Sequence, residues 1–313
     1  MQKFFASLGL ILATIIWGST FAAQRNAMEV ISPWSFSTIR TFLGALALLP
    51  VVLLQDLWMY KKVTFWGNAQ TAQERKFLLW GGFFCGLAIT PAMLAQQIGL
   101  CETSAGKTGF LTALYIVIVP VLGLFFKRKT SLLLWGAVFL ALAGSFLLCY
   151  QEGAGFALTR GDISVIACAF LYSIHILVID HFAPKADCLR LSLLQFLTAG
   201  ILAGGSSLFI ENAWTMEAVT KSAPYWLYAG IGSCGAAFTL QMVAQKYLHP
   251  VMTSLLMSLE SVFAVLAGWF FLKEHLSSYE LAGCLLLFLA VLLAQVPAPS
   301  PEKKGATKNL PQE

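Results

Sequence analysis

A single carboxylate stands inside a long apolar segment. Glu260 lies in SLLMSLESVFAVLAGWFFL, residues 254–272, and the next full charge along the chain is Lys273. In a bilayer such a charge costs about 2.5–3.5 kcal/mol unless it faces a cavity, finds a partner or takes up a proton. Two kinds of chemistry fit: exchange of a proton, because desolvation favours the neutral acid, and binding of a substrate amine. The alternative is a protonated Glu260 that only hydrogen-bonds to a neighbouring helix.

Glu260 belongs to one of two polar stripes that share the helical spacing i, i+4 and i+7. The first stripe is Thr253, Met257 and Glu260, and the second is Thr108, Thr112 and Tyr115. Glu260 follows Pro250 by ten residues, which is about 15 Å along a helix and half of a ~30 Å bilayer core. We expect the two stripes to converge at the membrane midplane and to outline a binding cavity.

Five further residues are candidates for the same cavity: Lys107, His175, Gln96, Gln241 and Trp17. Lys107 could attract a substrate carboxylate or extend to the lipid interface. His175 could relay protons, although a buried, hydrogen-bonded neutral histidine is the more common case. Gln96 and Gln241 could bind substrate or link helices, and Trp17 could form an apolar wall.

Other polar residues are not expected to contact substrate. Arg40, about six residues into a helix, is predicted to anchor helix carbonyls or to pair with an acidic residue, and the same interpretation holds for Asp180. The seven cysteines show no metal-ligand spacing, and Cys101 and Cys149 could pair or remain separate thiols. No G-x-x-x-x-G-K-[ST] loop occurs, so we expect neither a bound nucleotide nor another cofactor.

The elements that must position these residues are membrane helices. The chain has 313 residues, of which 58% are hydrophobic and 11% charged, so it is too apolar for a soluble domain. The first apolar run continues through Trp17 and is interpreted as a retained helix rather than a cleaved signal peptide. Pro91 and Pro120 are expected to bend helices 3 and 4. A helix that crosses the bilayer needs about 20 apolar residues. Ten such runs occur: 4–23, 34–54, 77–100, 105–126, 131–150, 162–180, 190–210, 224–245, 250–272 and 278–296.

Lysine and arginine residues set the predicted orientation. With the N-terminus inside, the cytoplasmic segments hold fourteen of these residues and the outer segments hold five. The expected location is a bacterial inner (plasma) membrane, with both termini facing the cytoplasm. The net charge of +5 then reflects topology rather than a nucleic-acid partner. Residues 297–313, rich in proline and charge, are expected to form a disordered cytoplasmic tail.

The chain contains an internal repeat. A shift of 145 residues aligns GLCETSAGKTGFLTALYIVIVPVLGLFF (99–126) with AQKYLHPVMTSLLMSLESVFAVLAGWFF (244–271), and Tyr115 with Glu260. An offset of 154 to 155 relates the earlier parts of the two units. Residues 4–150 and 160–296 are thus two five-helix units, and because five is odd they enter the membrane from opposite sides. Inverted repeats of this kind are a known architecture of secondary transporters, with the site where the repeats meet.

Three segments, together with the repeats, carry a resemblance to a known family. They are WGSTF (17–21), SAGKTGFLTALYIVIVP (104–120) and SLESVFAVLAGWFFLKEHLSSYELAGCLLLFLAVLL (258–293). The chain resembles the EamA branch of the drug/metabolite transporter (DMT) superfamily. This resemblance implies ten helices, a cavity lined mainly by helices 1, 3, 4, 6, 8 and 9, and transport of small organic metabolites such as amino acids, with export favoured. In one departure, Lys129 stands where many members carry an acidic residue after helix 4, as Glu274 does after helix 9.

Other functions stay open at this point. An uptake permease or exchanger of the same fold would use the same helices. An intramembrane enzyme needs a nucleophile with its base, or a ligand cluster on one face, and the four histidines are scattered. A channel or receptor would not need two inverted halves. The expected partners are a small-molecule substrate and the lipid bilayer, and a homodimer could form through the Gly-containing helices 5 or 10.

Overall fold

The chain is all-helical in the computed structural model, which describes residues 1–103, 105–125, 130–148, 150, 158–210, 215–272 and 277–296. The helices, in chain order, are α1 (Gln2–Ala27), α2 (Pro33–Tyr60), α3 (Ala72–Glu102), α4 (Ala105–Ala113), α5 (Tyr115–Phe125), α6 (Leu132–Leu148), α7 (Arg160–Phe182), α8 (Cys188–Ile210), α9 (Met216–Lys221), α10 (Ala223–Tyr228), the π-helix η1 (Ala229–Ala237), α11 (Phe238–Gln245), α12 (Pro250–Met257), α13 (Leu259–Leu272) and α14 (Ser278–Gln295).

These helices form ten membrane segments, as predicted. Among the described residues, eight spans are long and apolar enough to cross a membrane, and the two further apolar helices Leu132–Leu147 and Leu281–Ala294 are shorter. Segment 4 is α4 with α5, segment 8 is α10, η1 and α11 in line, and segment 9 is α12 with α13. The short helix α9 is an addition that the hydrophobic runs did not indicate. The all-helical membrane fold of two inverted five-helix repeats is confirmed.

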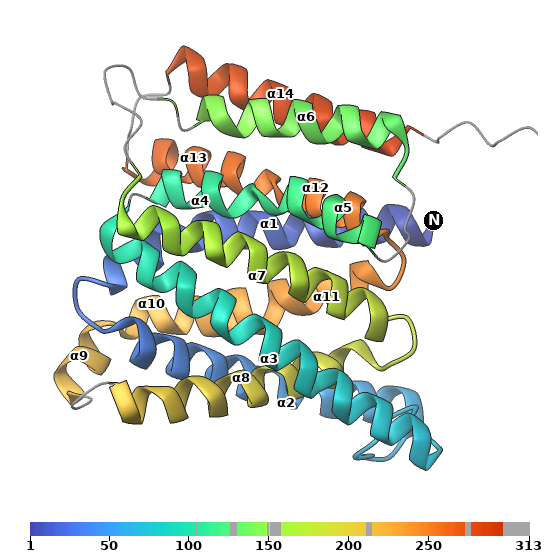
Figure 1. Cartoon of the computed structure of the whole chain (residues 1–313). Coiled ribbons are helices and arrows are strands. Elements are labelled where there is room, and N and C mark those ends of the chain that lie inside the picture. The colour runs from blue at the N-terminus through green and yellow to red at the C-terminus, as the bar shows by residue number, and fades with distance from the viewer. Residues whose placement is uncertain are drawn as a thin grey trace, which may run out of the picture.

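The two repeats interlock. Helix α1 packs against η1, α11 and α13 of the second repeat, and its counterpart α7 packs against α3, α4 and α5 of the first. Likewise α2 packs against η1, and its counterpart α8 packs against α3. The counterparts α6 and α14 lie side by side at one edge of the stack, and α2 and α8 lie together at the other (Figure 1). This exchange of partners is what a local two-fold axis between the repeats produces.

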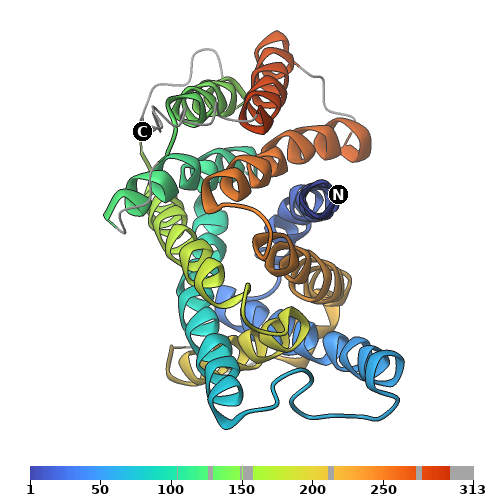
Figure 2. The same ribbon diagram turned by 90° about the vertical axis from the view of Figure 1, so that its right-hand side faces the viewer.

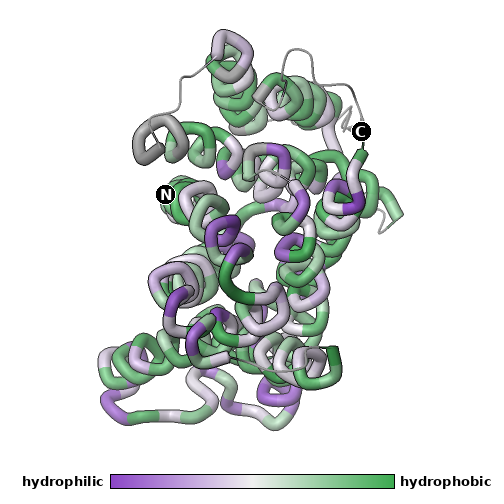
Figure 3. The backbone as a smooth tube through the Cα atoms, turned by 90° about the vertical axis from the view of Figure 1, so that its left-hand side faces the viewer, coloured by the Kyte–Doolittle hydropathy of each residue, from purple (hydrophilic) through white to green (hydrophobic). Residues whose placement is uncertain are grey.

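The ends of the helices have a consistent arrangement. In Figure 1, the start of α1 and the end of α14 lie at the same end of the stack, as an even number of crossings requires. Figure 2 views the stack from that end. Figure 3 views it from the opposite end, and the helices at its rim are coloured mostly as hydrophobic. Several positions named from the sequence lie outside the described residues: Lys129, Cys149, Lys273, Glu274 and the tail 297–313.

Side-chain caps define where several helices begin. The Thr71 hydroxyl accepts a hydrogen bond from the backbone N–H of Glu74, and the Glu74 carboxylate accepts one from the Thr71 N–H at the start of α3. Thr159 and Asp162 form the same reciprocal cap at the start of α7. Each cap satisfies backbone donors that the first helical turn leaves unpaired.

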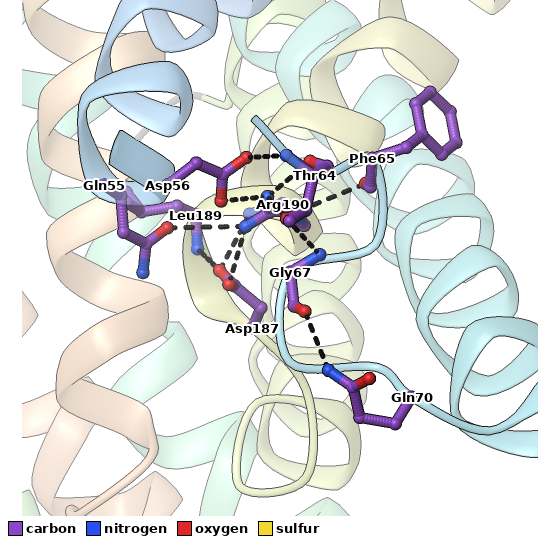
Figure 4. A network of polar contacts seen from close by, with 9 residues as sticks. All are labelled: Gln55, Asp56, Thr64, Phe65, Gly67, Gln70, Asp187, Leu189 and Arg190. Carbon is purple, nitrogen blue, oxygen red and sulfur yellow. Dashed lines mark hydrogen bonds and ion pairs between the residues drawn. The ribbon is translucent and has the colours of Figure 1, made fainter. Parts of the chain in front are cut away.

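Arg190 anchors the connection between α2 and α3 to the start of α8 (Figure 4). Its side chain is buried and forms ion pairs with Asp56 of α2 at 2.5 Å and with Asp187 at 2.9 Å. It also donates to the Thr64 carbonyl at 2.9 Å and to the Phe65 carbonyl at 3.3 Å. Two buried carboxylates thus offset the positive charge of Arg190.

Candidate functional site

Glu260 and Tyr115 meet at the centre of the structure. The Tyr115 hydroxyl donates a hydrogen bond to Oε1 of Glu260 at 2.8 Å, and both residues are buried. The two residues are counterparts in the repeat, 145 positions apart. A residue contacts its own counterpart only where the local two-fold axis passes between them. The Tyr115–Glu260 pair therefore lies on that axis.

Both helices that carry this pair are interrupted beside it. Helix α4 ends at Ala113 and α5 begins at Tyr115, and α12 ends at Met257 while α13 begins at Leu259. At the second interruption, the Ser258 hydroxyl donates to the Leu255 carbonyl at 2.7 Å. Discontinuous helices of this kind flank the binding sites of many secondary transporters, because a break frees backbone groups and lets the two halves move separately.

The interruptions do not fall at the prolines. Pro91 lies inside the continuous helix α3, and Pro120 lies inside α5. The break in segment 4 is at Leu114, where the backbone N–H bonds to the carbonyl of Leu111, only three residues earlier. Neither proline therefore marks an interruption: α3 is continuous through Pro91, and the break in segment 4 lies six residues before Pro120.

Helix α1 comes very close to the backbone of α13 at this level. A Cβ atom added at Gly18 would lie 2.6 Å from the Glu260 carbonyl oxygen and 2.7 Å from the Ala264 nitrogen. Only a residue without a side chain fits at this contact. Gly18 therefore brings α1 against the turn of α13 that carries Glu260.

A central cavity opens beside the pair. Its empty volume, which includes the open space at its mouth, is about 410 Å³. Its lining comes from both repeats: Trp17, Phe21, Gln24, Arg40, Met93, Gln96, Thr112, Tyr115, Tyr172, Ser233, Phe238, Met257 and Glu260. Segments 1, 3, 4, 6, 8 and 9 contribute, as the resemblance implied, and segment 2 adds Arg40.

Repeat counterparts line the cavity in pairs. The 145-residue offset relates Met93 to Phe238, Thr112 to Met257, and Tyr115 to Glu260. Trp17 and Tyr172 are related by an offset of 155. The cavity thus lies around the local two-fold axis, although its two halves differ in chemistry.

One wall of the cavity is aromatic. The ring centroids of Trp17 and Phe238 are 4.8 Å apart, and Tyr172 stacks on Phe238 at 6.4 Å. The indole N–H of Trp17 is buried and has no hydrogen-bond partner in the described part of the chain. This wall can hold an apolar or aromatic group, with one donor left for a polar atom.

Arg40 is the main departure from the sequence analysis. It is 1% exposed, and its Nη1 donates to the side-chain oxygen of Gln24 at 2.5 Å. Its guanidinium lies over the Phe36 ring, 5.3 Å from the centroid. Within the described residues it neither pairs with a carboxylate nor bonds a helix carbonyl, and its Nε and Nη2 have no partner. The predicted anchoring role is therefore not what the structure shows.

Six of the eleven candidate residues reach the cavity: Glu260, Tyr115, Thr112, Met257, Gln96 and Trp17. Five do not: Lys107, Thr108, His175, Gln241 and Thr253. His175 Nε2 shares a hydrogen bond with the Gln195 amide oxygen at 2.8 Å, and Gln241 donates to Gln245 at 2.9 Å. His175 thus links α7 to α8, and Gln241 bonds within α11, where Gln245 in turn donates to the Ile176 carbonyl of α7 at 2.8 Å.

Lys107 pairs with Asp162 instead of reaching the cavity. Their charged atoms are 2.6 Å apart, and Thr103 donates to the other carboxylate oxygen of Asp162 at 2.8 Å. The Asp162 side chain is fully buried, whereas that of Lys107 is 39% exposed. The pair ties the start of α4 to the start of α7, which belong to different repeats.

Several lining residues were not identified from the sequence: Phe21, Gln24, Met93, Ser233 and Phe238. The repeat offset could have found Met93 and Phe238, because they are counterparts on segments 3 and 8. Ser233 lies in η1, and a π-helix rotates the following side chains relative to a regular helix. No periodicity in the sequence marks that change.

Comparisons with known proteins agree with this architecture. The sequence profile described as the EamA-like transporter family matches residues 4–150 and 159–295. An uncharacterized transporter of Archaeoglobus fulgidus is 28% identical over 302 residues, covering 95% of this chain and 87% of that protein. An uncharacterized transporter of Bacillus subtilis is 23% identical over 297 residues, covering 91% and 95%. One crystal structure has the same fold, with a TM-score of 0.73 at 16% identity over 93% of this chain and 96% of that one. The chain therefore belongs to the EamA-like transporter family and is a multi-pass membrane transporter, not an enzyme.

Proposed function

We propose that the chain is a secondary active carrier that moves small organic metabolites, such as amino acids or related compounds, by alternating access. The observation that carries the proposal is the contact between Tyr115 and Glu260, two repeat counterparts that meet beside a cavity and between interrupted helices. In a carrier built from inverted repeats, the two halves can exchange conformations around a fixed central site. Inward-open and outward-open states then have similar energies.

Proton coupling is the second part of the proposal. Glu260 is buried in the wall of the cavity, and its only hydrogen-bond donor among the described residues is the Tyr115 hydroxyl. The Tyr115 hydroxyl stabilises an ionised carboxylate at this depth, whereas a protonated carboxyl group does not need that donor. A change of conformation that exposes Glu260 to one side of the membrane at a time would let it load and release a proton.

The family resemblance favours export, and the placement of lysine and arginine residues favours cytoplasmic termini. We propose net export across a bacterial inner membrane, with both termini cytoplasmic. Uptake or exchange by the same fold is the alternative.

A homodimer is a further proposal. Gly144 of α6 already forms a close contact within the chain, because a Cβ added there would lie 2.9 Å from the Gly283 carbonyl oxygen of α14.

The test uses purified protein in liposomes. Loaded substrate should accelerate uptake of the labelled compound from outside, which distinguishes a carrier from a channel. An imposed pH gradient should drive flux in the wild type, whereas Glu260→Gln should retain exchange and lose the response to the gradient. The matched control is Thr253→Val, a change in the same membrane segment but outside the cavity lining. Equal gradient-driven flux in Glu260→Gln and wild type would refute the proton role.

A further inference from the structure

We propose that the central cavity binds a small organic monocarboxylate, with its carboxylate on the guanidinium of Arg40. This inference rests on the proposed carrier function and names the substrate class of the same cavity. It begins from a single observation: a fully buried arginine whose Nε and Nη2 lack partners in the described part of the chain lines the central cavity.

The free edge of Arg40 has the right shape for a carboxylate. Nε and Nη2 lie on one edge of the guanidinium plane, and two parallel N–H groups there match the two oxygens of a carboxylate. Arginine stays protonated, so this edge cannot avoid its charge by losing a proton. A buried cation without a counter-ion is costly, and a carboxylate ligand would remove much of that cost.

The surroundings hold the guanidinium in position. Gln24 accepts from Nη1 on the opposite edge, and the Phe36 ring lies 5.3 Å from the guanidinium carbon. These contacts occupy one edge and one face. They leave the Nε–Nη2 edge available and reduce the entropy lost when a ligand binds.

No carboxylate of the described residues competes for that edge. The described ion pairs engage Asp56 and Asp187 with Arg190, Asp162 with Lys107, and Glu217 with Lys221. Glu260 lines the same cavity but bonds Tyr115 and makes no ion pair with Arg40 within these residues. The Nε–Nη2 edge of Arg40 is therefore open to direct pairing with a carboxylate that a ligand supplies.

Charge balance links the carboxylate to one proton. With Glu260 ionised, the empty cavity has no net charge, because Arg40 contributes one positive charge. With a monocarboxylate bound and Glu260 protonated, the net charge is again zero. The other two combinations leave one net charge of either sign in the cavity, which is unfavourable within a membrane. We therefore expect one proton to accompany each monocarboxylate.

The other titratable groups near Arg40 and Glu260 do not alter this balance. They are Tyr115 on α5, Cys168 and Tyr172 on α7, and Cys234 on η1. Tyrosine and cysteine are neutral around pH 7 in their ordinary states. The wall formed by Trp17, Tyr172 and Phe238 favours a ligand whose body is apolar or aromatic.

Binding by purified protein tests the proposal directly. The probes are phenylacetate, hexanoate and indole-3-acetate, each compared with its primary amide by isothermal titration calorimetry in detergent. A charge-assisted bond is worth about 1.5–3 kcal/mol, so at least one acid should bind about tenfold or more tightly than its amide. Arg40→Gln should abolish that preference and Arg40→Lys should retain part of it. Gln24→Glu, which supplies a counter-ion but keeps Arg40, should also abolish it.

Three outcomes would overturn the inference. In the first, none of the acids binds more tightly than its amide. In the second, folded Arg40→Gln or Gln24→Glu protein keeps the preference. In the third, phenethylamine or zwitterionic phenylalanine binds more tightly than phenylacetate. Each of these leaves the carrier proposal intact if exchange in liposomes persists, because exchange of labelled substrate tests alternating access of the two repeats and not the group that binds Arg40.

Discussion

Substitution of Gly18 by alanine should disturb the contact on which the central pair depends. The new Cβ would lie 2.6 Å from the Glu260 carbonyl oxygen, 2.7 Å from the Ala264 nitrogen and 2.7 Å from the Phe263 Cβ. Ordinary contacts between such atoms are about 3.5–4.0 Å, so α1 and α13 must separate by about 1 Å. Two of the three atoms belong to the backbone and cannot rotate away.

The magnitude follows from two opposing effects. Overpacking of a tight interface costs about 1–3 kcal/mol, and replacing a glycine inside a helix by alanine returns up to about 1 kcal/mol of helix propensity. We expect Gly18→Ala to lose about 1–2 kcal/mol of stability. Gly205→Ala is the matched control, because Gly205 lies inside α8 with nothing within 4 Å of an added Cβ. That variant should be as stable as wild type or up to about 1 kcal/mol more stable.

Two measurements check this prediction. Thermal unfolding in detergent should place Gly18→Ala several degrees below wild type and Gly205→Ala at or above it. Exchange of labelled substrate in liposomes should fall about tenfold or more in Gly18→Ala alone, because the turn that carries Glu260 is displaced by about 1 Å. If both variants match wild type in stability and exchange, the close approach of α1 to α13 is not a feature of the working protein.

Three further predictions concern polar contacts. Tyr115→Phe removes the hydrogen bond to Glu260 and should lower the flux driven by a pH gradient. Substrate exchange should persist, because the cavity keeps its shape. A response to the gradient equal to that of the wild type would argue against the contact. Asp56→Asn should destabilise the protein by about 1–3 kcal/mol, because Arg190 loses a buried charge-assisted hydrogen bond but keeps its ion pair with Asp187, and thermal unfolding in detergent would detect this. Lys107→Gln should cost no more than about 1 kcal/mol, as its side chain is partly exposed, and should leave the apparent substrate affinity unchanged. A large loss of affinity would mean that Lys107 contacts substrate.

The central pair was predictable because symmetry carries spatial information. The 145-residue offset aligned Tyr115 with Glu260, and helical rise put Glu260 halfway across the bilayer. Residues on a two-fold axis must meet their counterparts, so one alignment implied a contact between distant parts of the chain. The same offset relates Met93 to Phe238. Neither residue was selected from the sequence, because neither is polar or charged.

Partners across helices could not be read from spacing within one helix. Lys107 has the depth and charge of a residue that attracts substrate, but the partner that occupies it, Asp162, lies in the other repeat. Arg40 illustrates the opposite case. Its depth suggested a structural anchor, yet Gln24 holds one edge of its guanidinium and no described carboxylate takes the other. Side-chain pairing depends on how the helices rotate about their axes, which hydropathy does not determine.

The chemistry of the cavity is less symmetric than its backbone. Arg40 comes from the first repeat and its counterpart is the neutral Gln195; Glu260 comes from the second and its counterpart is the neutral Tyr115. When the two repeats exchange conformations, the water-accessible side of the cavity changes for both the permanent cation, Arg40, and the titratable acid, Glu260. If the repeats rock about the axis beside Glu260, a carboxylate on Arg40 and a proton on Glu260 bind to different repeats but must be released into the same compartment. Coupling then arises from charge neutrality in the occluded state, without any direct bond between proton and substrate.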